Sequence, residues 1–154
     1  ALIGCRYAAG HPELAEPENG IGILMQCFLA GSYRGKRIEL AARLKCEEVD
    51  GAATIWMRVD RAVMDPLRFD NMEMRPSDGA LHGTQGWSRR SIVLDVPENA
   101  ESIFFGFYLR GAGRAWIREL TFVEVGADTP VTGDFRPEGF TPVNLDFSRY
   151  AAAA

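Results

Sequence analysis

The stretch Arg-Ile-Glu-Leu-Ala-Ala-Arg-Leu-Lys at residues 37–45 decides the fold of this sequence. Its apolar residues fall at every second position, which places Ile38, Leu40 and Leu44 on one face and the charged residues on the other. Such alternation is typical of a β-strand with one buried face. Residues 91–96 repeat the pattern and end in a Pro-Glu-Asn turn.

A second strong signal is the aromatic run at residues 103–110, which is apolar on both faces. A strand of that kind is expected to be covered on both sides. The Gly-Ala-Gly sequence at 111–113 supplies the conformational freedom of a tight turn, and residues 115–125 then run back. The two strands are predicted to form an antiparallel hairpin.

Apolar segments separated by Gly, Pro, Asp or Asn recur along the chain, and no apolar stripe of helical period lasts three turns. The pattern predicts an all-β domain, a jelly-roll-like sandwich of two antiparallel sheets with almost no helix. One domain is expected over residues 1–150, followed by a four-alanine tail. The eight expected strands are 21–30, 36–46, 53–60, 67–72, 88–96, 102–110, 115–125 and 143–147.

The composition excludes several classes of partner. The 154 residues, 47% hydrophobic and 25% charged, fit one domain with a core. The net charge of −4 disfavours nucleic acid as a partner, and no apolar run approaches the ~20 residues that cross a bilayer, so no membrane partner is expected. Three cysteines form no metal or disulfide motif; Cys27 and Cys46 are expected in the core, and a cytoplasmic location is expected.

Residues 55–60 hold the first candidate site. Alternation sends Trp56, Arg58 and Asp60 to one face. An aromatic plane beside a guanidinium and a carboxylate suits a flat polar ligand such as a sugar ring. The alternative is a structural Arg58–Asp60 ion pair beneath a loop, with Trp56 filling the core.

The second candidate site follows at once. Asp70 and Asn71 are poor β formers inside an otherwise good strand, and such residues are tolerated where the side chain bonds to a loop, a ligand or a metal. Calcium is one alternative, although no Asp-x-Asp-x-Asp spacing is present and no cofactor is expected. His11 and His82 are isolated in loops, and no catalytic motif is found.

Taken together, several strings resemble a bacterial jelly-roll accessory domain found with transcriptional regulators and some hydrolases, over roughly residues 20–132. The strings are 33–37, 40–45, 56–60, 69–72, Arg75-Pro76, Gly83-Thr84, Trp87 and 94–97. The closing hairpin is also similar to the last strands of carbohydrate-binding modules and galactose-binding-like domains, although Trp116 is followed by Ile-Arg-Glu instead of an acidic pair. Relatives open with an Asn-Leu-Asp-Phe strand, which here stands at 144–147; we expect residues 143–147 to complete the sandwich instead of starting a second copy.

The resemblance implies a module that binds a saccharide or another small polar molecule, in fusion or partnership with a larger protein. An alternative is a small-molecule enzyme, hydrolase or cyclase-like, that uses Asp60 or Asp70 as general acid or base. A third is a domain that only interacts with proteins through an exposed apolar patch. The expected ligand-binding residues are Gln26, Trp56, Arg58, Asp60, Asp70, Asn71, Arg75 and Trp87.

Overall fold

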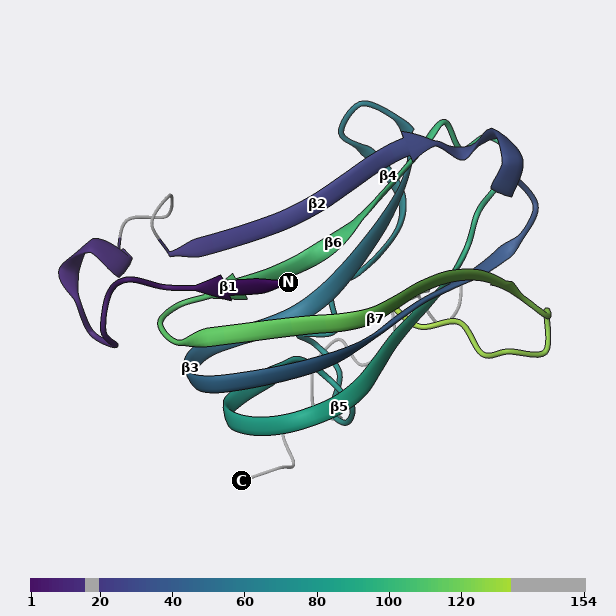
Figure 1. Ribbon diagram of the computed structural model, residues 1–154. Coiled ribbons are helices and arrows are strands. Elements are labelled where there is room, and N and C mark those ends of the chain that lie inside the picture. Colours follow the sequence, from purple (N-terminus) through teal and green to yellow (C-terminus); the bar gives the residue numbers. More distant parts are fainter. Residues whose placement is uncertain (16–19, 134–154) are drawn as a thin grey trace, which may run out of the picture.

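The computed structural model describes residues 1–15 and 20–133 and confirms an all-β fold (Figure 1). The expected strand at 143–147 lies outside the described residues and stays a prediction. Two short 3-10 helices are present among the described residues, and neither exceeds four residues. The elements are β1 (Leu2–Gly4), η1 (Pro12–Ala15), β2 (Ile21–Leu29), η2 (Ala30–Tyr33), β3 (Arg37–Ala62), β4 (Asp65–Asp70), β5 (Leu81–Asp95), β6 (Ser102–Arg110) and β7 (Arg114–Val125).

Strand β3 is the central strand of the fold and pairs with four other strands. Its first half, from Arg37 to Glu47, pairs with β5 on one side and β7 on the other, and its second half pairs with β6 and β4. The sequence predicted two separate strands here, which is wrong. Register shifts near Val49 and a positive φ of 53° at Glu48 bend the strand without ending it.

Because β3 curves from one half to the other, the antiparallel sheet curls over into two facing layers (Figure 1). We call β1, β7, the first half of β3 and β5 the first layer. We call β2, β6, the second half of β3 and β4 the second layer. Every pairing between strands is antiparallel.

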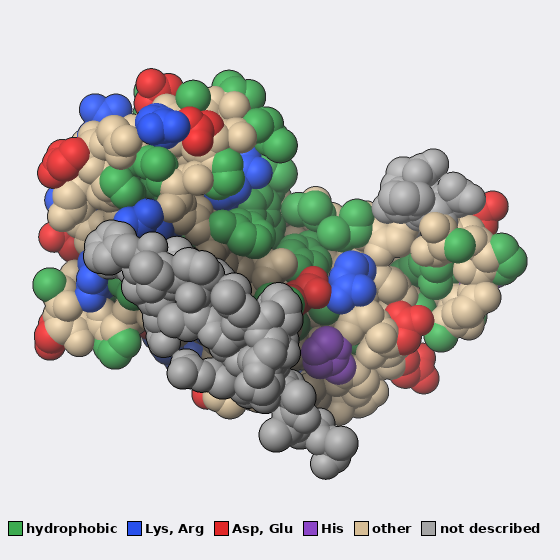
Figure 2. Space-filling model, turned by 180° about the vertical axis from the view of Figure 1, so that it is seen from behind, with side chains coloured by type: hydrophobic (Ala, Val, Ile, Leu, Met, Phe, Trp, Pro, Cys, Tyr) green, Lys and Arg blue, Asp and Glu red, His purple; other side chains and the backbone are tan. Residues whose placement is uncertain are grey.

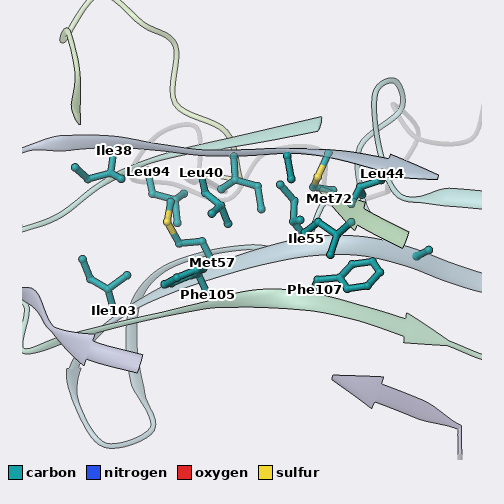
Figure 3. Close-up of a cluster of buried hydrophobic side chains, with 14 of the residues drawn as sticks. Ile38, Leu40, Leu44, Ile55, Met57, Met72, Leu94, Ile103, Phe105 and Phe107 are labelled. Carbon is teal, nitrogen blue, oxygen red and sulfur yellow. The ribbon is translucent and has the colours of Figure 1, made fainter. Parts of the chain in front are cut away.

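The core lies between these layers (Figure 3). Ile38, Leu40 and Leu44 extend from the first layer and are completely buried, as the alternation predicted. Ile55 and Phe107 meet them from the second layer. Burial of this kind contributes about 1.5–3 kcal/mol for each large apolar side chain, so the facing rows account for much of the fold's stability.

Two sequence expectations about the chain's edges need correction. Strand β1 was not expected, because Leu2–Gly4 is too short to show a period; it is held by pairing with Arg114–Trp116 of β7. Cys27 is exposed, whereas Cys46 is buried as expected. Strand β2 pairs with β6 alone among the described residues, so the outward-facing Cys27 lies at an edge that no other strand covers. In the described part of the chain, no helix is long and apolar enough to span a membrane.

Candidate functional site: the cavity between the layers

A cavity of about 490 Å³ opens between β2 and β7. It exists because β1 pairs with β7 only as far as Trp116, so in the described chain the rest of that edge of β7 has no neighbouring strand. The facing edge of β2 is equally unpaired. The two layers therefore diverge along this side, as the space between β2 and β7 in Figure 1 indicates.

The interior of the cavity is apolar. Leu24 and Gln26 face it from β2, opposite Phe107 and Phe105 of β6, and Ile117 contributes from β7. Phe105 and Phe107 are only 9% and 2% exposed, so they belong to the core and form the apolar wall of the cavity.

One end of the cavity is closed by an aromatic cluster. The rings of Phe28, Tyr33, Phe105 and Phe122 lie 5.3–6.0 Å apart, mostly edge to face. Phe28 is two residues beyond Gln26 on the same strand. The cavity is thus blocked in that direction by packed side chains.

Polar groups gather at the mouth of the cavity, on β7. Arg43 is opposite Arg118 and Ala41 is opposite Thr121, so two residues, Glu119 and Leu120, face one residue of β3. This β-bulge places Glu119 at a φ of 53°, a conformation that is unusual for any residue except glycine. Arg118 and Glu119 line the rim of the cavity, but the Arg118 guanidinium lies over the Trp87 ring and the Glu119 carboxylate lies 3.7 Å from Arg43, both on the outer face of the first layer. The Arg118 Nε and a Glu119 oxygen are 3.3 Å apart.

The first predicted group shares a face as expected but does not form a hollow. Trp56, Arg58 and Asp60 all lie on the outer face of the second layer. Trp56 is 8% exposed and lies against Gly106, and Asp60 is completely buried. The Arg58 Nε lies 2.8 Å from Asp60 Oδ1, and the guanidinium is 4.7 Å from the ring of Phe104. This arrangement matches the structural alternative, and the ligand-binding role of these residues stays a prediction.

The second predicted group holds a loop together. The Asp70 carboxylate accepts hydrogen bonds from Arg75 and from the backbone N–H of Met72, at 2.7 Å for the latter. Arg75 also donates to the carbonyl of Ser91 at 2.9 Å. Asn71 accepts from the backbone N–H two residues on, at 3.2 Å. Hydrogen bonds to the loop that follows β4 therefore stabilise Asp70 and Asn71 at these strand positions.

The remaining two predicted residues are far from both groups along the chain. Trp87 is on β5 at the outer face of the first layer, with the Arg118 guanidinium 4.2 Å from its ring. Gln26 alone among the eight lines the cavity. No three His, Cys, Asp or Glu side chains come together as metal ligands within residues 1–15 and 20–133.

Sequence reasoning missed a charged cluster where the loop after β4 meets β6. The Tyr108 hydroxyl donates to Glu73 Oε1 at 2.5 Å, and Arg110 Nη2 donates to Oε2 at 2.7 Å. Burial by itself raises the pKa of Glu73, but the hydrogen bonds from Arg110 and Tyr108 outweigh it, so this pKa is lower than usual. Burial and the Glu73 carboxylate raise the pKa of Tyr108. No periodicity marks Glu73, so the sequence held no signal for this contact.

Strand β2 is also unusual for an edge strand, because it carries no charged residue and exposes apolar side chains. Ile21, Ile23, Met25 and Leu29 are each at least 40% exposed. Seen from behind, hydrophobic side chains also gather in the hollow between the two wider ends of the molecule (Figure 2). An exposed apolar surface is what the interaction-domain alternative expects.

Comparison with known proteins gives one relative by sequence. The chain is 44% identical over 126 residues to an uncharacterised HTH-type transcriptional regulator, YbfP, of Bacillus subtilis (strain 168). The match covers 80% of this chain but only 41% of that protein, so the chain spans about two fifths of its relative's length. No family model matches the sequence. The resemblance to a domain found with transcriptional regulators is thereby confirmed.

Two solved structures share part of the architecture. One is the enzymatically active domain of tailspike protein 4 of bacteriophage CBA120, with a TM-score of 0.49, 13% identity, and coverage of 70% of this chain and 14% of that one. The other is described as "CBM4 structure and function", with a TM-score of 0.43, 17% identity, and coverage of 67% and 61%.

Proposed function

We propose that this domain binds a small polar ligand, a saccharide or a molecule of similar shape, in the cavity between the layers. The observation that carries the proposal is the combination of an aromatic, apolar interior with polar groups at the mouth. Phe105 and Phe107 give the cavity an apolar wall, Gln26 supplies an amide donor and acceptor for hydroxyls, and Arg118 and Glu119 lie along the rim. The volume of about 490 Å³ lies within the range of small-molecule sites.

The relative suggests what such binding is for. The regulator's name refers to a helix-turn-helix motif, which needs two α-helices. The described residues of this chain contain no α-helix, so that motif does not lie within the part of the chain that the structure describes. In the proposal, the β domain senses a ligand and a separate part of a longer or partner protein acts on DNA.

The cavity fits ligand binding better than it fits a hydrolysis mechanism that uses a pair of carboxylates. That chemistry needs two carboxyl groups flanking the substrate. Glu119 supplies the one carboxylate that lines the cavity in the described chain, and Asp60 and Asp70 do not face it. Both aspartates are instead engaged by arginines, Arg58 and Arg75.

A thermal-shift screen against neutral sugars, nucleosides and common metabolites tests the proposal, because a ligand that binds only the folded state raises Tm. A ligand found in this way should lose its effect in Gln26→Ala and Glu119→Gly. Glycine is suited to the positive φ at position 119, so Glu119→Gly should keep the fold. Cys27→Ser, on the outer side of the same strand as Gln26, is the matched control and should bind normally. Trp56→Ala should also bind normally.

Two results would overturn this assignment. One is a ligand whose effect survives Gln26→Ala and Glu119→Gly but is lost in Trp56→Ala with the fold intact, which would move the site to the outer face of the second layer. The other is the absence of any stabilising compound in a broad screen.

A second candidate function, self-association through β2, is favoured by its charge-free, apolar and unpaired edge. Light scattering coupled to size exclusion tests it. A dimer that Met25→Lys converts to a monomer would support it, and a monomer at all concentrations would reject it.

A further inference from the structure

The free edge of β2 carries backbone groups that can pair with another strand. Just before β2, the carbonyl of Gly20 accepts a hydrogen bond from the Gly111 N–H at 2.8 Å. Just after it, the Ala30 N–H donates to the carbonyl of Glu101 at 2.9 Å. The register between β2 and β6 is unbroken in between, so the even-numbered residues of β2 turn their N–H and C=O groups toward β6. The odd-numbered residues therefore present these groups at the free edge.

The side chains of the odd-numbered residues form an uncharged row on the outer face of the second layer. Met25 shares that face with Trp56, because both are opposite Gly106 of β6. Natural edge strands usually carry a charge, a proline or a bulge that prevents further pairing, and β2 has none of these. Two copies of a chain with a net charge of −4 can meet here without placing like charges against each other. The row consists of Ile21, Ile23, Met25, Cys27 and Leu29.

The other sheet edges in the described part of the chain are protected. On β5, the Thr132 N–H donates to the carbonyl of Val93 at 2.7 Å, and the Thr132 hydroxyl accepts from the Val93 N–H at 2.8 Å. Strand β4 carries Pro66 and pairs with β3 through two register shifts. Strand β7 is paired with β1 at one end and has its bulge at Glu119. When two copies join edge to edge, the edge that meets β2 is therefore β2 of the second copy.

We propose that two copies of this domain pair β2 with β2 in antiparallel register about a twofold axis at Met25, which joins their two cavities into one site. The inference rests on the two functions proposed above and gives the second its partner and geometry. Because the free groups of both strands belong to odd-numbered residues, odd residues must lie opposite odd residues. The register centred on Met25 is the one that uses all nine residues of β2. Such an interface is self-complementary and closes at two copies.

This register also brings the cavity-facing residues of the two copies together. Leu24 and Gln26 line the cavity. In the proposed dimer, Leu24 of one copy lies opposite Gln26 of the other, so each cavity gains a second amide along the side where β2 is now unpaired. A ligand in the joined cavity contacts both copies. Ligand binding and dimer formation then strengthen each other.

Disulfide cross-linking tests the register, with Cys27→Ser present in every variant. Leu24 and the opposite Gln26 form a non-hydrogen-bonded pair, whose Cα atoms are about 4.5 Å apart, within reach of a disulfide. After mild oxidation, a mixture of Leu24→Cys and Gln26→Cys proteins should give a cross-linked dimer on non-reducing electrophoresis. Each variant alone should give at least tenfold less, and Cys27→Ser by itself gives the background from the remaining cysteines.

Light scattering coupled to size exclusion tests the stoichiometry. The wild type should have the mass of a dimer, and Met25→Lys should halve it. Met74→Lys is the matched control, because Met74 is an exposed methionine in the loop after β4 and should leave the dimer intact. Circular dichroism establishes that both variants are folded.

Three outcomes would overturn this inference. They are a wild type that is monomeric at all concentrations, a dimer that Met25→Lys does not dissociate, and cross-linking of Leu24→Cys or Gln26→Cys alone that equals cross-linking of the mixture, which requires another register. A compound that stabilises a strictly monomeric wild type would overturn it as well, while supporting ligand binding in the cavity. Failure of the dimer and failure of the cavity proposal are therefore distinguishable.

Discussion

The Nε atom of Arg58 lies 2.8 Å from Oδ1 of Asp60, and Asp60 is completely buried. A buried carboxylate is stable in a fold only when a partner compensates its charge. The position of Arg58, 77% covered and 4.7 Å from the Phe104 ring, makes it that partner. The pair therefore contributes to the integrity of the second layer whether or not a ligand reaches it.

Arg58→Ala should destabilise the domain by about 3–5 kcal/mol, because it leaves a buried charge without its partner. Urea denaturation followed by circular dichroism measures the change. Arg61→Ala is the control, since the exposed Arg61–Asp65 pair is worth about 0–1 kcal/mol. The double variant Arg58→Met/Asp60→Leu should recover most of the loss. If Arg58→Ala unfolds at the wild-type urea concentration, the pair has no structural role.

Gly106→Ala should destabilise the domain by about 1–3 kcal/mol, the usual cost of an overpacked site. A Cβ at this position would clash with the backbone carbonyl oxygen of Leu24 on β2 and would lie 2.9 Å from the indole nitrogen of Trp56. Gly86→Ala is the matched control, because a Cβ there meets no atom within 4 Å. Equal melting temperatures for the two variants would contradict the close packing of β2 and Trp56 against Gly106.

Glu73→Gln should lower stability more at neutral than at acidic pH. The pKa of Glu73 is lower in the folded than in the unfolded state, so its contribution is present above the unfolded pKa and is lost as pH falls through the folded pKa. The expected loss at pH 7 is about 1–3 kcal/mol, because the buried Tyr108 hydroxyl loses its charged acceptor; the half-exposed Arg110 can turn to water. Denaturation at pH 7 and pH 3 measures it, with the exposed Glu101→Gln as control. A loss that is independent of pH would contradict the charged hydrogen bonds.

Thiol labelling should distinguish the cysteines. Cys27 is exposed and should react quickly with a thiol reagent under native conditions. Cys46 is buried, burial raises the pKa of its thiol, and it should react only on unfolding. Mass spectrometry of the labelled peptides gives the result, and Cys27→Ser should remove the fast reaction. Rapid labelling of Cys46 would mean that β3 opens locally.

Period-two patterning predicted the core well because it depends only on neighbours along the chain. Ile38, Leu40 and Leu44 are buried as the alternation indicated. The same rule placed Trp56 and Asp60 on one face but carried no information about what covers that face. Gly106, which leaves room for the indole nitrogen of Trp56, comes from a strand about 50 residues away.

The cavity and the charged cluster depend on the same kind of long-range information. The contact between Glu73 and Tyr108 joins residues 35 positions apart, and neither position has a local signature. Glu119 lies at the rim of the cavity in a bulge, which an alternation pattern does not encode. Only Gln26 could be selected beforehand, and it was selected through the resemblance.

The length of β3 has a mechanical meaning. One continuous chain of 26 residues contributes the central strand of both layers, so neither layer can separate without pulling on the backbone of the other. Amide hydrogens on its two halves should therefore exchange in a single global opening. A force or a bound molecule that tilts one end of β3 would therefore also displace the strands at the opposite end of the domain.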